Sequence, residues 1–223
     1  MSTWVVVPVK PLRLAKSRLA EVLTPEQRQQ LAETMLRHVL SVVRSVPQVT
    51  GTLVISRDNR VLAIAREYGA KTVQESGTPE LNAALMRATR IIASWRSDML
   101  LILPADLPLL APQDITALLG YTQADDDPCV VVAPDRNHDG TNALLVRPPG
   151  LLNYAYGPGS FQRHAVQARD AGATVYTYHS ERLVQDIDLP EDLENFYRMQ
   201  QHGTYNPPLP MTYDAIQTLL DAR

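Results

Sequence analysis

Short apolar and β-branched runs alternate with stretches of helical periodicity along almost the entire 223-residue chain. The expected strands cover residues 4–9, 52–56, 72–74, 99–103, 129–133, 143–146 and 174–178. The expected helices cover residues 25–46, 58–68, 80–96, 112–120, 161–171 and 190–200. Strands that alternate with helices favour a mostly parallel sheet that is sandwiched by helices. We therefore predict an α/β fold in one domain at 1–201, followed by a tail at 202–223 that ends in a short helix near 213–220.

Composition narrows the classes of function that such a chain can carry. The formal net charge of −3 and the pI of about 5.9 argue against bulk nucleic-acid binding. No apolar run approaches the ~20 residues of a membrane span, and Pro8 interrupts the first apolar run before it could serve as a signal peptide. The single cysteine, Cys129, excludes a disulfide framework and a cysteine-based metal site. We expect a cytoplasmic protein that acts on small molecules, with no nucleic-acid or membrane partner.

The loop after the first expected strand concentrates positive charge. The stretch VVVPVKPLRLAKSRL contains Lys10, Arg13, Lys16 and Arg18, and no acid appears before Glu21. Ligands of open α/β sheets bind outside the carboxyl ends of the strands, so cations placed there suit a polyphosphate. A solvated surface loop remains an alternative. The loop has no glycine and is therefore neither a P-loop nor a Rossmann fingerprint, so a phosphate grip would rest on side chains.

Two acidic segments are candidates for a metal site. Asp106 lies in LPADLP, directly after the most apolar run of the chain, and a hard cation such as Mg²⁺ binds one or two carboxylates plus phosphate oxygens. In DIDLPEDL, Asp186 and Asp188 precede a helix that starts at a proline, and alternation places both acids on one face of an extended segment. The alternatives are a turn cap or helix cap for Asp106 and an N-cap for Asp186 or Asp188.

A glycine-rich turn and a threonine suggest a small anion site. Thr141 precedes an expected strand in DGTNALLV, and Gly157 and Ser160 open an expected helix in YGPGSFQRH. Backbone amides at a helix N-terminus, joined by a Ser or Thr hydroxyl, can bind an anion. Ordinary turn chemistry with Ser160 as the N-cap is the alternative. His164 is the one histidine near a candidate site, and no Ser/His/Asp or Cys/His arrangement is evident.

Taken together, these motifs resemble the CofC/FbiD guanylyltransferases of coenzyme F420 biosynthesis. The resemblance rests on PVKPLRLAKSRL, LPADLPLL, DGTNALL, YGPGSFQRH and DIDLPEDL, in the order of the family and over residues 4–200. It implies a nucleotide-diphospho-sugar transferase fold of the GT-A type, similar to the MobA-like molybdenum-cofactor guanylyltransferases. It also implies transfer of GMP from GTP to the phosphate of phosphoenolpyruvate or 2-phospho-L-lactate, with Mg²⁺ as the cofactor and pyrophosphate as the second product.

The resemblance assigns roles to particular residues. Lys16, Asp106 and Asp188 would be catalytic, and Asp106 and Asp188, with Asp186 as the less favoured candidate, would bind the metal. Thr141, Gly157 and Ser160 would contact the acceptor. The residues implied in nucleotide binding are Lys10, Arg13, Lys16, Ser17, Arg18, Asn82, Pro104 and Asp106.

Two segments depart from the family pattern, and other functions stay open. A glycine is replaced in PELNAAL at 79–85, and the loop before Thr141 reads NHDGTN without an extra glycine–threonine pair. One rival is a related nucleotidyltransferase that acts on a sugar phosphate or a molybdopterin. A second is a glycosyltransferase, although Pro108 stands where the second acid of its acidic pair would be. A third is a non-catalytic nucleotide-binding protein, and a homodimer is also left open.

Overall fold

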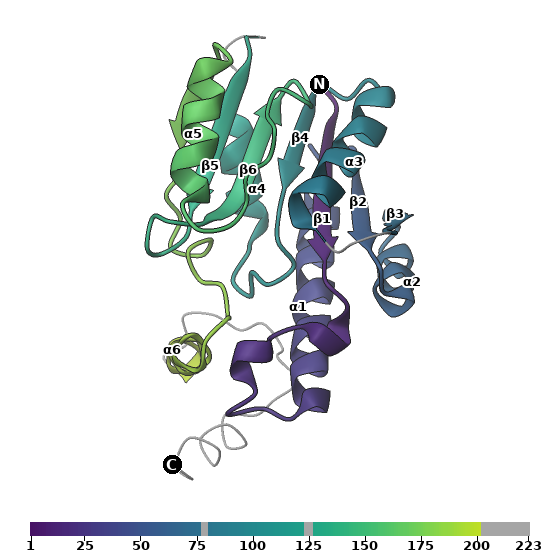
Figure 1. The fold of residues 1–223 in the computed structure, drawn as a ribbon, viewed down its shortest axis with the longest axis vertical. Coiled ribbons are helices and arrows are strands. Elements are labelled where there is room, and N and C mark those ends of the chain that lie inside the picture. The colour runs from purple at the N-terminus through teal and green to yellow at the C-terminus, as the bar shows by residue number, and fades with distance from the viewer. Residues whose placement is uncertain (77–79, 123–126, 202–223) are drawn as a thin grey trace.

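A computed structural model describes residues 1–76, 80–122 and 127–201, and the tail expected at 202–223 lies outside this range. Seven strands form one sheet (Figure 1): β1 (Thr3–Val9), β2 (Gly51–Ser56), β3 (Lys71–Gln74), β4 (Met99–Ile102), β5 (Cys129–Pro134), β6 (Thr141–Arg147) and β7 (Thr174–Thr177). The α-helices are α1 (Pro25–Ser45), α2 (Asn59–Glu67), α3 (Leu81–Ser94), α4 (Pro112–Gly120), α5 (Ser160–Asp170) and α6 (Pro190–Gln201). The α/β prediction is confirmed.

The order of strands in the sheet is β3-β2-β1-β4-β6-β5-β7. Every neighbouring pair is parallel except the two pairs that β6 makes, with β4 and with β5. The sheet is thus mostly parallel, as predicted, with one reversed strand that the sequence pattern did not reveal. Because β6 runs opposite to β4, the amino end of β6 lies at the edge where β4 ends.

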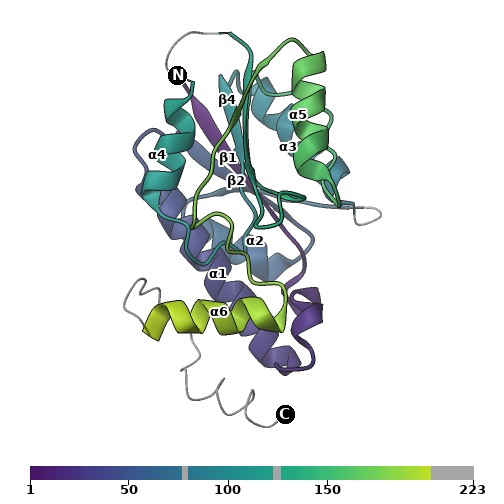
Figure 2. The ribbon, with the colours of Figure 1, turned by 90° about the vertical axis from the view of Figure 1, so that its left-hand side faces the viewer.

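Helices cover both faces of the sheet in two layers (Figure 2). One layer contains α1, α2 and α4, and the other contains α3 and α5. The first core cluster joins α1 to the sheet through residues such as Leu36, Val39 and Val54. The second includes Leu85 of α3, Ala168 of α5 and the opposite face of the strands. Burial on both faces explains the continuous apolar runs of β4, β5 and β6.

Local sequence explains how the first strand and first long helix are delimited. Pro8 has no N–H to donate, and it lies beyond Val6, the last β1 residue that pairs with β4. Thr24 accepts a hydrogen bond from the backbone N–H of Gln27, whose side chain accepts from the Thr24 N–H in return. This capping box, with Pro25 at the first helical position, fixes the start of α1.

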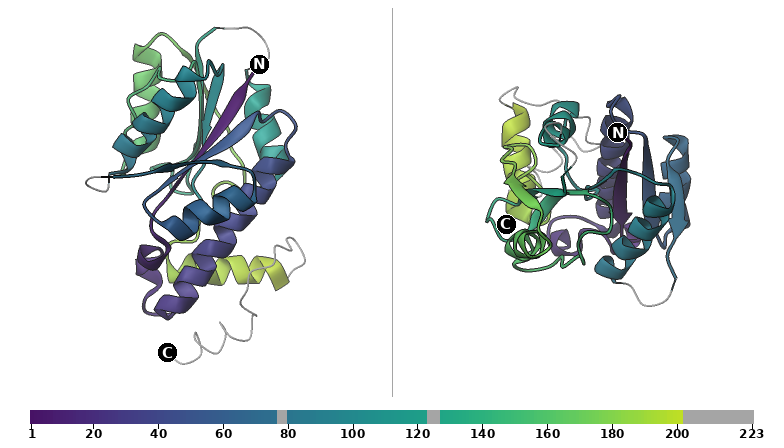
Figure 3. Two further views of the ribbon diagram at one scale, coloured as in Figure 1. Left: turned by 90° about the vertical axis from the view of Figure 1, so that its right-hand side faces the viewer. Right: turned by 90° about the horizontal axis from the view of Figure 1, so that it is seen from above.

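The last helix lies away from the two layers, below the carboxyl ends of the parallel strands (Figures 2 and 3). A third apolar cluster joins it to the loop after β1 and to the beginning of α1. Its members are Leu19, Val22, Leu23, Leu31, Met35, Leu109, Ile187, Leu193, Phe196 and Tyr197. This packing carries the segment just before α6 to the same edge of the sheet as the basic loop. Among the described residues, no helix has the length and apolar character needed to cross a membrane.

Candidate active site

The basic loop folds into two short 3-10 turns, Leu12–Leu14 and Ser17–Leu19. Leu12 and Leu19 are buried and anchor one turn each, and the Leu12 N–H donates to Asp58 Oδ2 at 2.9 Å. Lys16 lies between the turns with φ of 53° and ψ of 38°, a left-handed conformation that is uncommon for a residue with a side chain. The loop is therefore an ordered part of the fold, and the alternative of a solvated surface loop does not describe it.

The Lys16 ammonium joins the acids of the two predicted metal motifs. Its Nζ donates to Asp106 Oδ2 at 2.7 Å and to Asp188 Oδ1 at 2.9 Å. The Lys16 side chain is only 6% exposed, whereas those of Asp106 and Asp188 are 31% and 45% exposed. Burial would lower the pKa of Lys16, but the charges of Asp106 and Asp188 outweigh that effect and raise it. Lys16 is consequently charged and held rigidly between two carboxylates.

The three acids at this point differ in their electrostatic surroundings. Burial together with repulsion from Asp106 and Asp188 raises the pKa of Asp186 to about 6. For Asp188, burial alone would raise the pKa, but attraction from Lys16, then Arg18 and Lys10, lowers it overall. The Lys16 ammonium thus favours the charged form of Asp188 more strongly than that of Asp186. In the described part of the chain, no three His, Cys, Asp or Glu side chains converge as a ready-made metal site.

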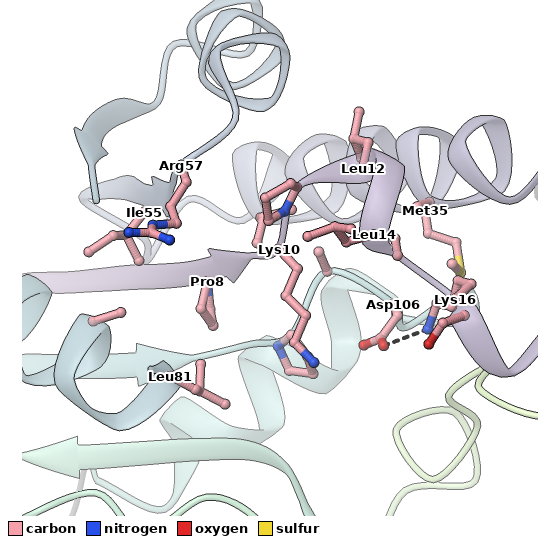
Figure 4. A pocket seen from close by; sticks show the side chains of 18 of the residues that line it. Pro8, Lys10, Leu12, Leu14, Lys16, Met35, Ile55, Arg57, Leu81 and Asp106 are labelled. Atoms are coloured by element: carbon pink, nitrogen blue, oxygen red, sulfur yellow. Dashed lines mark hydrogen bonds and ion pairs between the residues drawn. The ribbon is translucent and has the colours of Figure 1, made fainter. Parts of the chain in front are cut away.

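A cavity of about 560 Å³ opens beside this cluster at the carboxyl edge of the sheet (Figure 4). In Figure 4, Lys10 extends into it from the end of β1, and Lys16 and Asp106 meet at one side. Of the residues predicted from sequence, the cavity is lined by Lys10, Lys16, Ser17, Arg18, Pro104, Asp106 and Asp188.

Two residues predicted to bind nucleotide are not among those that line the cavity. Arg13 is exposed at the first 3-10 turn. Asn82 bonds instead to the backbone of Tyr156: its Oδ1 accepts from the Tyr156 N–H at 2.8 Å and its Nδ2 donates to the Tyr156 carbonyl at 3.4 Å. Asn82 thus ties the start of α3 to the segment before α5.

The far end of the cavity contains charged residues that the sequence interpretation missed. Arg57 and Glu75 line it, and each directly follows the end of a parallel strand, β2 or β3. Glu80 also lines it, but its carboxylate caps α3 by accepting from the Asn82 N–H at 2.8 Å and from the Ala83 N–H. The rule that ligands bind at the carboxyl ends of strands could have identified Arg57 and Glu75.

The predicted anion-site residues come together at the amino end of β6. The Ser160 hydroxyl donates to Thr141 Oγ1 at 3.2 Å, and His164 Nδ1 lies 3.1 Å from the same oxygen. Gly157 and Gly159 both have positive φ, 123° and 72°. The alternative in which Ser160 is the N-cap is wrong, because Gly159 occupies that position and Ser160 is the first helical residue.

The structure also differs from the alternative in which Asp106 and Asp188 serve as helix caps. Asp192 Oδ2, not Asp188, accepts the N–H groups that precede α6, from Asp188 at 3.1 Å and from Leu189 at 2.8 Å. Asp114 Oδ2 accepts the Ala111 N–H at the start of α4. The Asp106 and Asp188 side chains are thus left to face Lys16.

Comparison with known proteins adds to this geometry. The chain matches the family described as "Guanylyl transferase CofC like" over residues 3–206. It belongs to this family. The phosphoenolpyruvate guanylyltransferase of Rubrobacter xylanophilus is 45% identical over 86% of this chain and 92% of its own length. The 2-phospho-L-lactate guanylyltransferase of Methanothermobacter thermautotrophicus, which is 37% identical, covers 86% of this chain and 83% of its own length.

Solved structures with much lower sequence identity share the fold. A putative nucleotide-diphospho-sugar transferase from Desulfovibrio desulfuricans superposes with a TM-score of 0.74 at 16% identity, over 100% of this chain and 95% of that one. A CMP:2-keto-3-deoxy-manno-octonic acid synthetase solved with CTP gives 0.63 at 16% identity, over 91% and 100% of the two chains. The predicted nucleotide-diphospho-sugar transferase fold is confirmed for this CofC-like chain.

Proposed function

We propose that this chain transfers GMP from GTP to the phosphate of a three-carbon acid, phosphoenolpyruvate in the first instance, and releases pyrophosphate. The observation that carries the proposal is the cavity wall, where Lys10, Lys16 and Arg18 stand beside the convergent carboxylates of Asp106 and Asp188. Membership in the CofC-like family supports it, as do relatives at 45% and 39% identity that are phosphoenolpyruvate guanylyltransferases.

The residues present suit a reaction that needs alignment and charge neutralisation. An oxygen of the acceptor phosphate attacks the α-phosphorus of GTP, the bond to the β-phosphate breaks, and pyrophosphate leaves with the electron pair. A phosphate monoester has its second pKa at about 6, so the attacking group is already ionised at neutral pH and needs no general base. Lys10, Lys16 and Arg18 would hold the triphosphate and stabilise the departing pyrophosphate.

Mg²⁺ fits the acids of this site. Asp106 and Asp188 direct carboxylate oxygens at one point, where the Lys16 ammonium, itself a cation, binds both. Two carboxylates plus substrate phosphate oxygens are a usual ligand set for Mg²⁺. Asp106 and Asp188 would hold the ion, and Asp186 is the less favoured ligand. Once bound, the ion would supply charge neutralisation at the α-phosphate.

The acceptor would lie at the amino end of β6. The buried hydroxyl groups of Thr141 and Ser160 lie within hydrogen-bond distance of each other there, and the carbonyl of Gly157, whose φ is positive, accepts from the Ser160 N–H. Because β6 is reversed, this group of residues shares the sheet edge with Asp106. Thr141, Gly157 and Ser160 are not among the residues that line the cavity beside Lys16. The acceptor phosphate would therefore reach the triphosphate from the neighbouring β6 side of the same sheet edge.

Product mass spectrometry with both acceptors in competition tests the proposal. With GTP and equal amounts of phosphoenolpyruvate and 2-phospho-L-lactate, we expect the guanylylated product of phosphoenolpyruvate to dominate. If the phospholactate product dominates, the acceptor is 2-phospho-L-lactate, the acid that the 37% identical relative is named for. The proposal would be overturned if GTP released pyrophosphate with a sugar phosphate or a molybdopterin as the acceptor and with neither of the two acids.

A further inference from the structure

Three buried side chains form a hydrogen-bonded chain at the amino end of β6. Thr141 is 7% exposed, Ser160 is 1% exposed and His164 is fully buried. His164 Nδ1 and the Ser160 hydroxyl both lie within hydrogen-bond distance of Thr141 Oγ1, at 3.1 and 3.2 Å. The chain continues on the other side of the imidazole, where His164 Nε2 lies 3.1 Å from the Ala155 backbone nitrogen.

The Ala155 contact determines which imidazole nitrogen carries the proton. A backbone N–H can only donate, so His164 Nε2 must accept with a free lone pair. In a neutral ring the proton is then on Nδ1, which donates to Thr141 Oγ1. Arg163 holds the Ala155 backbone in place, because its Nη2 donates to the Ala155 carbonyl at 2.7 Å. Burial, followed by the charge of Arg163, lowers the pKa of His164 to about 4, which keeps the ring neutral.

This tautomer decides what the Thr141 hydroxyl can do. A hydroxyl oxygen accepts two hydrogen bonds, and Thr141 Oγ1 accepts from His164 and from Ser160. Its own O–H proton is then directed away from both partners. Thr141 becomes an obligatory donor, and a donor with fixed direction suits an anionic oxygen.

We propose that His164 is a positioning residue for the acceptor, because it holds the Thr141 hydroxyl as a donor to an anionic oxygen of the three-carbon acid. The inference rests on the proposed function, which places the acceptor at Thr141. His164 itself is fully buried and acts through Thr141. Its removal should therefore weaken acceptor binding and leave GTP binding unchanged.

Two substitutions separate the two nitrogens of His164. In His164→Asn, the amide can replace Nδ1 and still donate to Thr141, but it does not reach the Ala155 N–H. In His164→Gln, the longer side chain can accept from the Ala155 N–H, but it loses the donor to Thr141. We expect His164→Gln to raise the KM for phosphoenolpyruvate about tenfold or more, a loss of about 1.4 kcal/mol. His164→Asn should stay within about threefold of the wild type, and the KM for GTP should be unchanged in both.

A double-mutant cycle tests whether His164 acts through Thr141. Thr141→Val removes the hydroxyl and preserves the shape of the side chain. If the inference holds, adding His164→Gln to Thr141→Val raises the acceptor KM no further. Additive effects, equal acceptor KM values for the Gln and Asn variants, or parallel increases in the KM for GTP would each show a merely structural role and overturn it.

A spectroscopic measurement separates this inference from the proposed function. In the free enzyme, ¹⁵N–¹H correlation spectra of the His164 ring should show a protonated Nδ1 and an unprotonated Nε2. A protonated Nε2 would overturn the inference even if GMP transfer is confirmed. A second outcome is an unprotonated Nε2 in an enzyme that uses neither acid. The tautomer would then be correct, but the proposed acceptor and the role of His164 in binding it would both be wrong.

Discussion

Lys16 Nζ lies 2.7 Å from Asp106 Oδ2, although 90 positions separate the two residues in the sequence. The pair joins the loop after β1 to the loop after β4, and the bond to Asp188 adds the segment before α6. One ammonium thus assembles three distant parts of the chain at the carboxyl edge of the sheet. In the proposed reaction these three parts would surround the triphosphate.

Replacement of Asp106 by Asn should abolish turnover and preserve the fold. The amide keeps the size of the side chain but loses the charge needed for a metal ion, so we expect kcat to fall by at least about a hundredfold. Pyrophosphate release measures the loss, and thermal unfolding checks the fold. Asp170→Asn, at the exposed C-terminal end of α5, is the matched control and should behave as wild type. Near-normal activity of Asp106→Asn at saturating Mg²⁺ would contradict the metal assignment.

Lys16→Ala and Lys16→Gly should be equally inactive but differ in stability. Both remove the ammonium that pairs with Asp106 and Asp188. Position 16 has φ of 53°, where glycine is free of the strain that a Cβ introduces. We expect the glycine variant to be more stable than the alanine variant by about 1 kcal/mol. Chemical denaturation measures the difference, and equal stabilities would argue against a left-handed residue at this position.

Stability should depend on the neutral state of His164. Its pKa of about 4 in the folded protein lies below the usual value of 6.5, so the unfolded chain takes up the proton first as the pH falls. The free energy of unfolding therefore decreases from about pH 6.5 downward and this contribution levels off near pH 4. Between pH 7 and pH 5, the wild type should lose about 2 kcal/mol more than His164→Gln, which has no titrating ring. Parallel pH profiles for the two proteins would contradict the assigned state of the ring.

Glu75 should contribute to the choice of guanine over adenine. It lines the cavity directly after β3, and a carboxylate can accept from the N1–H and the exocyclic amine of guanine, which adenine does not present in that pattern. Glu75→Gln should lower kcat/KM for GTP by about tenfold and leave kcat/KM for ATP unchanged. Glu80→Gln is the control, since the Glu80 carboxylate already caps α3. An equal loss with both nucleotides would show that Glu75 does not read the base.

Much of the fold could be predicted from sequence because its signals are local. The alternation of buried runs with amphipathic helices predicts the sheet, and the carboxyl-edge rule predicts that Lys16, Asp106 and Asp188 lie together. The direction of β6 could not be predicted. Every residue of β5 and β6 is buried, so neither strand shows an alternating pattern that would distinguish a parallel from an antiparallel neighbour.

The contacts between the predicted site residues also could not be predicted from the sequence. His164 contacts Thr141 across 23 positions, and Lys16 contacts Asp188 across 172, so no short motif contains either pair. The sequence predicted that Asp106 and Asp188 share one edge of the sheet, but it did not reveal that the Lys16 ammonium bonds to both of them. The role of Asn82 was likewise invisible, because it depends on the path of the backbone at Tyr156.

The strands of the sheet form two sets, one on each side of the junction between β4 and the reversed strand β6. The strands from residues 3–102 build the side that carries the basic loop, and those from 129–177 build the side that carries Thr141 and Ser160. The two sets are joined in the sheet by the pairing of β4 with β6 alone. Under the proposed assignment of the site residues, the choice of acceptor and the choice of nucleotide depend on separate stretches of the chain. A chimera that exchanges residues 129–177 with a phospholactate-using relative should change the preferred acid and keep the preferred nucleotide.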